Sequence, residues 1–342
     1  MVELNGKKIL VTFLMHLGDL TLTTPFIHAL RKAAPDARIT MLVDEKLKDV
    51  VLFNPYLDEV VTIDKKGRDN SILSLWACSR HLSKLDFDVL INLHPNERCS
   101  FIDAMTSVKL RTGTTHKIFK WFWDVFTPLD RSMHAADMYL DVLQQLGVQD
   151  LSNNGLEIFP GEEHFLEAEL FWQEQNITDQ DKLIGFNIGS AVPTKRWPPE
   201  RFADVADIFA AKGYKTVFFG GPMDEEMVAK ATGYMQTRPI IATGHFAIGG
   251  LAAAMRRCCL IITNDSGPMH VAISQKVPIV AMYGPSNPKL YGPYTKDAVI
   301  VTAQPPCQGC ADGMKHSCDD LQCMSRMTVE QVVAAADTML NK

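Results

Sequence analysis

Residues 260–272 read LIITNDSGPMHVA, an apolar run that ends abruptly in a polar turn and continues as a helical pattern. The run Leu260–Thr263 has the composition of a buried parallel strand. Asp265 or Ser266 can cap the following helix, and Pro268 suits its first turn, where a missing N–H costs nothing. Free N–H groups and the positive end of the helix dipole favour a phosphate beyond the strand. The stretch therefore predicts either a diphosphate site or an ordinary strand-to-helix turn.

Working outward, apolar runs alternate with helical patterns along both halves of the chain, which indicates parallel sheets covered on both faces. In the first half the expected strands and helices are 8–14, 38–43, 60–63, 87–93 and 108–111, and 20–34, 47–53, 72–85 and 134–146. In the second half they are 183–188, 216–219, 240–242, 260–263 and 278–283, and 163–174, 200–212, 224–235, 247–257 and 328–340. The sequence therefore predicts the α/β class in two successive halves.

Composition limits the function. The chain has 342 residues, of which 46% are hydrophobic and 22% charged, as in a globular protein large enough for two domains. No apolar run approaches the roughly 20 residues that span a bilayer, and the start MVELNGKK is unlike a signal peptide, so we expect a cytoplasmic location. The net charge of −6 argues against a general nucleic-acid binder.

Polar residues follow several predicted strands, where ligands gather in open α/β sheets. Lys195 and Arg196 would bring cationic donors to a phosphate, or they form a solvated surface pair. Asp19 follows Gly18 at the first strand end, where a carboxylate can act as a general base worth ~10²–10⁴ in rate, or as a helix N-cap. Glu225–Glu226 begin a helix, where a carboxylate favours the dipole or accepts from ribose hydroxyls.

Two nucleotide-binding classes lack their motif. The first strand is followed by no Gly-x-Gly-x-x-Gly, and the chain holds no Gly-x-x-x-x-Gly-Lys-[Ser/Thr]. A dinucleotide-dependent dehydrogenase and a P-loop nucleotidase are therefore disfavoured.

Four cysteines lie close together near the C-terminus, at Cys307, Cys310, Cys318 and Cys323. Such a set can hold a tetrahedral structural zinc, although the second spacing is not that of a paired zinc knuckle. Free thiols are the alternative, and disulfides are least expected in a reducing compartment.

An ordered set of motifs over most of the chain resembles the lipopolysaccharide heptosyltransferase family, glycosyltransferase family 9. The set is Gly18-Asp19-x5-Pro25, His134 and Tyr139 ahead of Leu146-Gly147, Gly189 with Thr194-Lys195-Arg196-Trp197-Pro198, Phe219-Gly220-Gly221 with Glu226, Asn264-Asp265-Ser266-Gly267-Pro268-Met269-His270, Gly284-Pro285, Gly292-Pro293 and Cys307 with Cys310.

The resemblance implies a GT-B architecture, in which two Rossmann-like domains with parallel sheets face each other across a cleft. We expect an acceptor-binding domain over residues 1–155 and a nucleotide-sugar-binding domain over 156–327. Residues 328–342 are expected to form a helix that packs back on the N-terminal domain.

The resemblance also implies an inverting, metal-independent transfer of heptose from ADP-heptose to an inner-core sugar of lipopolysaccharide. Asp19 would be the base, and Lys195 would neutralise the departing diphosphate. The donor would be held by Gly189, Thr194, Lys195, Arg196, Gly220, Gly221, Glu226, Asp265, Ser266, Gly267, Pro268, Met269 and His270. No cofactor would be needed for catalysis.

The segment 111–126 is aromatic and basic, and it interrupts the strand–helix rhythm. It is expected either to rest on the inner membrane surface or the lipid A-linked acceptor, or to form a core helix of the first domain. For the acceptor itself, the candidates are Gly18, Arg111, Lys117 and Lys120. Rival functions are a family member with another nucleotide-sugar donor, a nucleotide-sugar epimerase of the same architecture, and an inactive protein that keeps the donor site.

Overall fold

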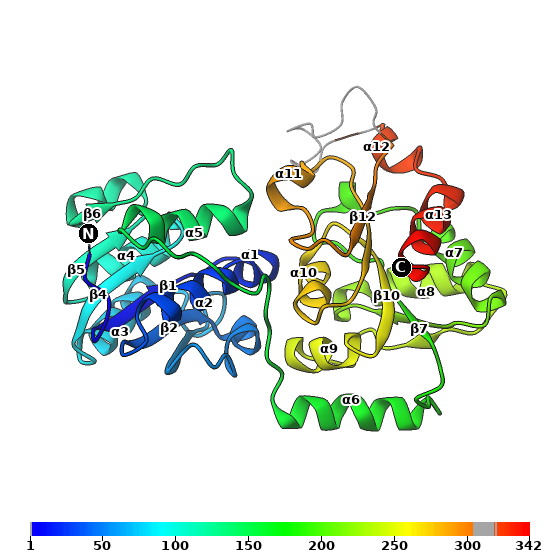
Figure 1. Ribbon diagram of the computed structural model, residues 1–342, viewed down its shortest axis with the longest axis horizontal. Helices are drawn as coiled ribbons and strands as arrows, with labels where there is room; N and C mark the ends of the chain where they lie inside the picture. Colours follow the sequence, from blue (N-terminus) through cyan, green and yellow to red (C-terminus); the bar gives the residue numbers. More distant parts are fainter. Residues whose placement is uncertain (1, 304–317, 319) are drawn as a thin grey trace. The chain divides into compact units, whose positions relative to one another are not determined.

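The computed structural model describes residues 2–303, 318 and 320–342. The chain divides into two compact units, Met1–Phe159 and Pro160–Lys342 (Figure 1). The division falls a few residues after position 155, where the sequence places the boundary. Each unit is a parallel sheet with helices on its faces, which confirms the predicted α/β class.

The described part of the first unit contains a six-stranded parallel sheet in the order β3-β2-β1-β4-β5-β6. Its strands are β1 (Lys8–Thr12), β2 (Arg38–Asp44), β3 (Glu59–Ile63), β4 (Phe87–Asn92), β5 (Val108–Gly113) and β6 (Val125–Phe126). Its helices are α1 (Leu17–Thr21), α2 (Thr24–Ala33), η1 (Glu45–Val50), α3 (Ile72–Ser83), α4 (Glu97–Met105), η2 (Lys117–Phe122) and α5 (Ala135–Gln145), where η denotes a 3₁₀ helix.

The second unit repeats this design, with the strand order β12-β11-β10-β7-β8-β9. Its strands are β7 (Leu183–Asn187), β8 (Lys215–Phe219), β9 (Ile240–Ile241), β10 (Cys258–Asn264), β11 (Ile279–Met282) and β12 (Ala298–Val301). Its helices are α6 (Glu162–Glu174), η3 (Pro193–Lys195), α7 (Pro199–Ala211), η4 (Pro222–Asp224), α8 (Glu225–Tyr234), α9 (Ile248–Met255), α10 (Gly267–Ser274), α11 (Pro288–Tyr291), α12 (Gln322–Ser325) and α13 (Val329–Leu340).

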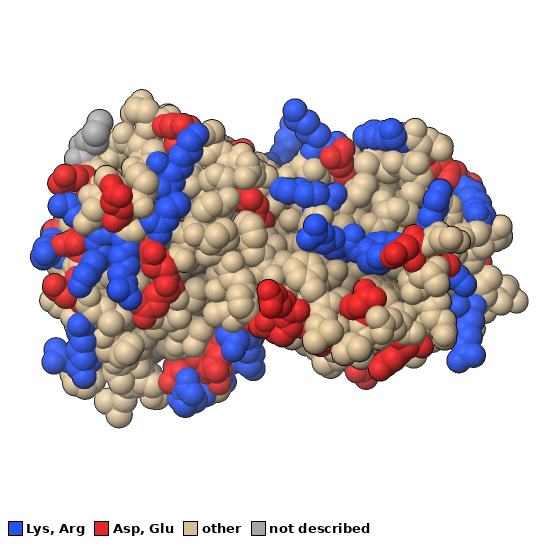
Figure 2. Space-filling view, turned by 60° about the horizontal axis from the view of Figure 1, so that its bottom comes forward, with Lys and Arg blue, Asp and Glu red and all other residues tan. Residues whose placement is uncertain are grey.

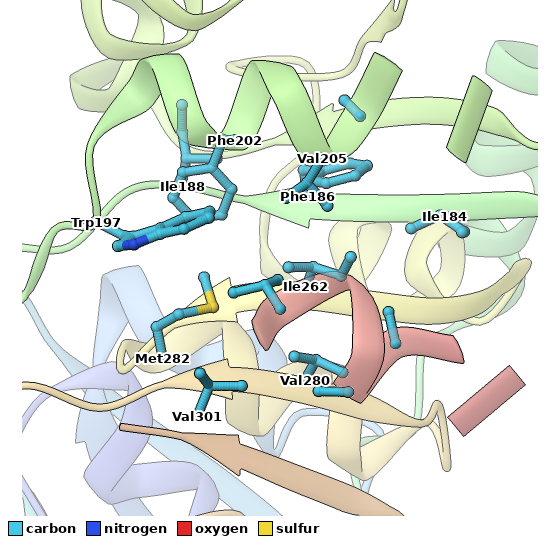
Figure 3. Close-up of a cluster of buried hydrophobic side chains, with 14 of the residues drawn as sticks. Ile184, Phe186, Ile188, Trp197, Phe202, Val205, Ile262, Val280, Met282 and Val301 are labelled. Atoms are coloured by element: carbon cyan, nitrogen blue, oxygen red, sulfur yellow. The ribbon is translucent and has the colours of Figure 1, made fainter. Parts of the chain in front are cut away.

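The core of the second unit lies between its sheet and helices α7 and α13. Figure 3 shows Phe186 of β7 beside Val205 of α7, Ile262 on the neighbouring strand β10, and Trp197 near the end of β7. All four side chains are fully buried. The apolar runs of the parallel strands therefore supply this core, as expected for a sheet buried on both faces.

The C-terminal helix corrects one expectation. Val332, Ala336 and Met339 of α13 are buried in the core of the second unit, and the helix contacts α7, β10, β11 and β12. The amphipathic pattern of this helix predicted its existence, but the expectation that it packs back on the N-terminal domain is wrong. Its apolar stripe is covered by the sheet that immediately precedes it in the sequence.

Three local predictions also differ from the structure. The helix expected over 20–34 is two helices, because Pro25 has no N–H for the carbonyl of Thr21 and its ring would clash there. The segment 47–53 is part of a 3₁₀ helix, η1. Helix α4 was missed because its buried side includes Ser100 and Asp103, which hide the apolar period.

The surface carries charges of both signs. Basic and acidic side chains interleave over the face drawn in Figure 2, as befits a net charge of −6. Among the described residues, no helix has the length and apolar character needed to cross a bilayer.

Candidate active site

Both sheets contain a topological switch point, where the chain changes its direction of growth. In the first sheet it lies between β1 and β4, and in the second between β10 and β7. Ligands of open α/β sheets bind outside the carboxyl ends of the strands at such points. The Asp19 loop follows β1, and the turn Asn264–Ser266 ends β10. The topology therefore puts both predicted site segments at the positions where ligand sites form.

Hydrogen bonds of Asn264 and Trp197 hold the segments at the second switch point together. The main-chain N–H of Trp197 donates to Asn264 Oδ1 at 3.0 Å, and Asn264 Nδ2 donates to the Ile188 carbonyl at 2.7 Å. The Trp197 indole is buried in the core and donates to the Met327 carbonyl at 3.1 Å. Trp197 thus pins the loop that carries Lys195 and Arg196 to the ends of β7 and β10.

Asp265 is the centre of a buried polar cluster. Lys195 Nζ lies 2.7 Å from Asp265 Oδ2, and the two side chains are only 14% and 6% exposed. Ser286 Oγ, which follows β11, donates to the same carboxylate oxygen. Burial, with the adjacent Asp265 carboxylate, raises the pKa of Tyr283 well above its usual range, so the phenol stays protonated. The Lys195 ammonium is therefore held by Asp265 at the carboxyl edge of the second sheet.

The start of α10 lies in this cluster. Ser266 is the N-cap residue, and its hydroxyl accepts from Asn187 Nδ2 at 2.8 Å instead of capping the helix. Asn187 Nδ2 also donates to Thr263, while its Oδ1 is buried without a hydrogen-bond partner in the described chain. Gly267 and Pro268 form the first turn, with Met269 and His270 buried behind them. The helix N-terminus and Lys195 provide complementary charge for an anion.

The glycines after β7 and β8 surround Asp224. A Cβ on Gly189 would lie 2.1 Å from Asp224 Oδ1, and one on Gly220 would lie 2.9 Å from Asp224 Cβ. The Gly221 N–H donates to Asp224 Oδ2 at 2.9 Å. Gly189 is therefore required sterically, because the Asp224 carboxylate occupies the space beside it.

The remaining predicted donor residues differ in burial. Thr194 is buried in η3, and Arg196 Nε donates to the Ser190 carbonyl at 2.8 Å. Glu226 is exposed and pairs with Lys230 at 2.7 Å, and this hydrogen bond lowers the pKa of Glu226. Glu226 is thus an ionised, accessible acceptor at the start of α8.

At the first switch point, Gly18 and Asp19 lie in the first turn of α1, and both are partly exposed. His94 follows the neighbouring β4, and its ring packs edge-to-face on Phe13. Burial, with smaller contributions from Arg131 and His16, lowers the pKa of His94 to about 4, so its imidazole is neutral at pH 7. His94 Nδ1 is buried without a hydrogen-bond partner among the described residues.

The predicted acceptor cations are divided between two environments. Arg111 Nε donates to the Asp103 carbonyl at 3.1 Å, and its Nη2 donates to the Thr106 carbonyl, so its guanidinium holds the end of α4. Lys117 and Lys120 lie exposed on η2, where Lys120 Nζ is 4.4 Å from the Phe126 ring centre. Helix η2 has no buried residue, and Trp121 is 94% exposed. The alternative of a core helix is therefore wrong for this segment.

The cysteine prediction remains a prediction. Cys307 and Cys310 lie outside the described residues. Cys318 is partly buried and Cys323 buried, both as thiols. No cluster of three metal-binding side chains occurs in the part of the chain that the structure describes.

Sequence reasoning missed several residues of these sites. No role was predicted for Asn187, Ser286 or His94. Asn187 is the penultimate residue of the predicted strand 183–188, His94 directly follows the strand 87–93, and Ser286 lies three residues beyond the strand 278–283. Their position at a strand end was the available signal. Their partners, such as Asp265 for Ser286, lie on other strands and could not be identified from spacing.

Two doubly wound units with polar side chains gathered at both switch points define the GT-B class of enzymes. Residues 75–318 match the family described as "Glycosyltransferase family 9 (heptosyltransferase)". The chain belongs to glycosyltransferase family 9 and is a glycosyltransferase. This favours a transferase over the epimerase alternative.

Individual proteins agree with this assignment. A glycosyl transferase family 9 structure from Veillonella parvula is 53% identical, with a TM-score of 0.95 over 99% of both chains. The structure of Escherichia coli ADP-heptose lps heptosyltransferase II is 21% identical, with a TM-score of 0.81 over 98% of both chains. Lipopolysaccharide heptosyltransferase 3 of E. coli K12 is 24% identical over 341 residues, covering 94% of this chain and 95% of its own.

Proposed function

We propose that the chain transfers heptose from ADP-heptose to an inner-core sugar of lipopolysaccharide. The observation that carries the proposal is the buried Lys195–Asp265 pair beside the N-terminus of α10. A fixed ammonium and a helix N-terminus favour a leaving group with two negative phosphates. The E. coli relatives named for ADP-heptose and for lipopolysaccharide support this choice of donor and acceptor.

In the proposed reaction, Asp19 removes the proton from the acceptor hydroxyl, whose oxygen attacks the anomeric carbon with inversion. The bond to the diphosphate breaks, and Lys195 with the first turn of α10 stabilises the charge that develops on ADP. Arg196 adds a second cation, and Glu226 accepts from the ribose hydroxyls. Because these groups supply both the base and the charge, the proposed step requires no metal, and undiminished activity in EDTA would support that.

We further propose that η2 places the enzyme on the cytoplasmic face of the inner membrane. Ile118 and Trp121 are 65% and 94% exposed, and Lys117 and Lys120 flank them. Exposed aliphatic and indole groups beside lysines suit an interface of anionic lipids. The lipid-linked acceptor would then be met at the surface where it resides.

The test is a donor screen followed by transfer. Calorimetry with ADP-, UDP- and GDP-sugars should give the tightest binding for ADP-heptose. Incubation with a heptose-deficient core acceptor should give a glycoside whose anomeric configuration, determined by NMR, is opposite to that of the donor. Tighter binding of a UDP- or GDP-sugar would favour the alternative of a family member with another donor. Consumption of the donor without an acceptor would instead favour epimerisation or hydrolysis.

A further inference from the structure

A buried ammonium in the first unit has no role in the chemistry above. Lys65 follows β3 and is 12% exposed, and its Nζ lies 3.1 Å from Asp44 Oδ2, whose side chain is 7% exposed. The same Nζ donates to the carbonyls of Leu14 at 3.0 Å and Met15 at 2.8 Å. An ammonium has three donors, and these three oxygens account for all of them. Lys65 is therefore saturated by the protein and has no donor left for a substrate.

The two carbonyls belong to the segment that joins β1 to α1. Asp19 lies in the first turn of α1, a few residues beyond Met15. Helix α1 begins at Leu17, and its N-cap residue His16 makes no side-chain hydrogen bond to the first turn, so the start of the helix lacks this stabilisation. The main-chain bonds from Lys65 hold the approach to this helix instead.

The contacts of Lys65 link the segments that follow β1, β2 and β3 to helix α4. Asp44 ends β2, and its Oδ1 accepts from the Lys46 N–H at 3.2 Å. The Lys65 carbonyl in turn accepts from Arg98 of α4, which follows β4. The Lys65 ammonium thus ties the segment after β1 to the end of β2, and the Lys65 main chain, which follows β3, is held by Arg98 of α4. Figure 1 shows β1 and β2 side by side in this sheet.

We propose that Lys65 is a positioning residue for Asp19, an inference that rests on the proposed role of Asp19 as the base. The ammonium sets the path of the Leu14–Met15 backbone and so the place where α1 presents the carboxylate. A reacting group displaced by about 1 Å can lose on the order of 10²-fold in rate. Loss of the anchor should therefore reduce the chemical step and leave donor binding unaffected.

The test uses a double variant, Lys65→Met with Asp44→Asn, which removes both charges together. Removing Lys65 alone would leave a buried carboxylate unpaired, whereas Asn at position 44 can still accept from the Lys46 N–H. The expected result is a kcat lowered about 10- to 100-fold, with the KM for ADP-heptose within about two-fold of the parent value. Lys109→Met, which breaks the exposed Lys109–Asp88 pair of the same sheet, is the matched control and should leave both values unchanged.

Combination with Asp19→Asn separates positioning from a general structural role. If Lys65 acts through Asp19, adding Lys65→Met and Asp44→Asn to the Asp19→Asn variant should lower its remaining kcat by less than about two-fold. A full additional loss in that background would overturn the inference. A parent-like kcat for the Lys65→Met, Asp44→Asn variant, together with a lowered kcat for Asp19→Asn, would also overturn the inference. A full rate for Asp19→Asn itself would refute the proposed base, and the inference with it.

Should the double variant fold poorly, Lys65→Arg provides the second measurement. Arginine keeps the positive charge, but its longer side chain and planar guanidinium would place the donors elsewhere and so shift the Leu14 and Met15 carbonyls. We expect a parent-like unfolding temperature and a kcat lowered several-fold, again with an unchanged donor KM. A parent-like kcat in this variant would overturn the positioning role.

Discussion

The Trp197 N–H and the Asn264 side chain join two segments that lie 67 positions apart in the sequence. One segment carries Lys195 and the other carries Asp265, so this hydrogen bond holds the two members of the buried ion pair in register. Asn264 completes the link by donating to the Ile188 carbonyl. The proposed diphosphate site thus depends on a neutral amide that touches no ligand in the proposed reaction.

Replacement of Asn264 by alanine should therefore impair both stability and donor binding. It would leave the Trp197 N–H and the Ile188 carbonyl buried without their partner, at a cost of about 1–3 kcal/mol for each group. Urea unfolding and calorimetry with ADP would measure the two effects. Gln173→Ala, which removes an exposed bond to Glu169 in α6, is the control and should change neither. Parent-like ADP affinity in Asn264→Ala would contradict the proposed linkage.

Lys195→Met, combined with Asp265→Asn so that no buried carboxylate is left unpaired, should weaken binding of the diphosphate selectively. A charge-assisted hydrogen bond contributes about 1.5–3 kcal/mol, so ADP affinity should fall roughly 10- to 100-fold. Adenosine, which lacks the diphosphate, should bind the variant and the parent equally well by calorimetry. The control Lys212→Met breaks the half-exposed pair between Lys212 at the C-terminal end of α7 and Asp337 of α13, and it should leave both affinities intact. Equal losses for ADP and adenosine would point to a general collapse of the site.

Asp19→Asn should lower the rate of transfer and leave donor binding unchanged. The amide cannot take the proton of the acceptor hydroxyl, so kcat should fall by about 10²–10⁴-fold. ADP-heptose affinity should stay within about two-fold of the parent value, because the proposed donor site lies in the second unit. Asp36→Asn, at an exposed position bonded to Asn5, is a suitable control. A variant with full transfer activity would exclude Asp19 as the base.

The fold could largely be predicted from the sequence because buried parallel strands are apolar runs that alternate with helical patterns along both halves of the chain. Helix α4 escaped because buried polar residues such as Asp103 interrupt its period. Helix α13 was expected, but an amphipathic stripe does not say which sheet covers it.

The site was predictable in part for a similar reason. Lys195 and Asp265 could each be selected because both follow strands in turns rich in Gly and Pro. Their mutual ion pair could not, since it spans 70 positions and depends on the adjacency of β7 and β10. Lys65 was overlooked for the same reason, as its carbonyl partners are about 50 positions away.

The exposed residues of η2 lead to a membrane-binding prediction. Trp121→Glu should reduce binding to vesicles that contain anionic phospholipid, because it replaces a group suited to the interface with a charge that the lipids repel. Vesicle sedimentation should show at least a several-fold loss, and activity on a short water-soluble acceptor should persist. Leu166→Glu in α6 introduces the same charge at a side chain that is 61% exposed, and it should leave vesicle binding unchanged. Equal losses in both variants would indicate a non-specific charge effect.

The last prediction concerns Asp103, a fully buried carboxyl group at the first sheet. Its Oδ2 accepts from Thr12 Oγ1 at 2.9 Å and from Asn92 Nδ2 at 2.6 Å, yet burial outweighs these bonds and raises the pKa of Asp103 to about 8. In the unfolded chain the pKa should be about 3.9. Between these values the folded state holds one proton more, so this group should lower the free energy of unfolding by up to about 1.4 kcal/mol per pH unit as pH rises.

Asp103→Asn should remove that slope, because an amide stays neutral and its oxygen can accept the same bonds. Urea unfolding at pH 5, 6, 7 and 8 should show the variant gaining stability relative to the parent as pH rises. Asp88→Asn is the control, because Lys109 lowers the pKa of that partly exposed carboxyl and its effect should appear only in acid. Parallel stability curves for Asp103→Asn and the parent over this range would mean that Asp103 does not hold its proton in the folded protein.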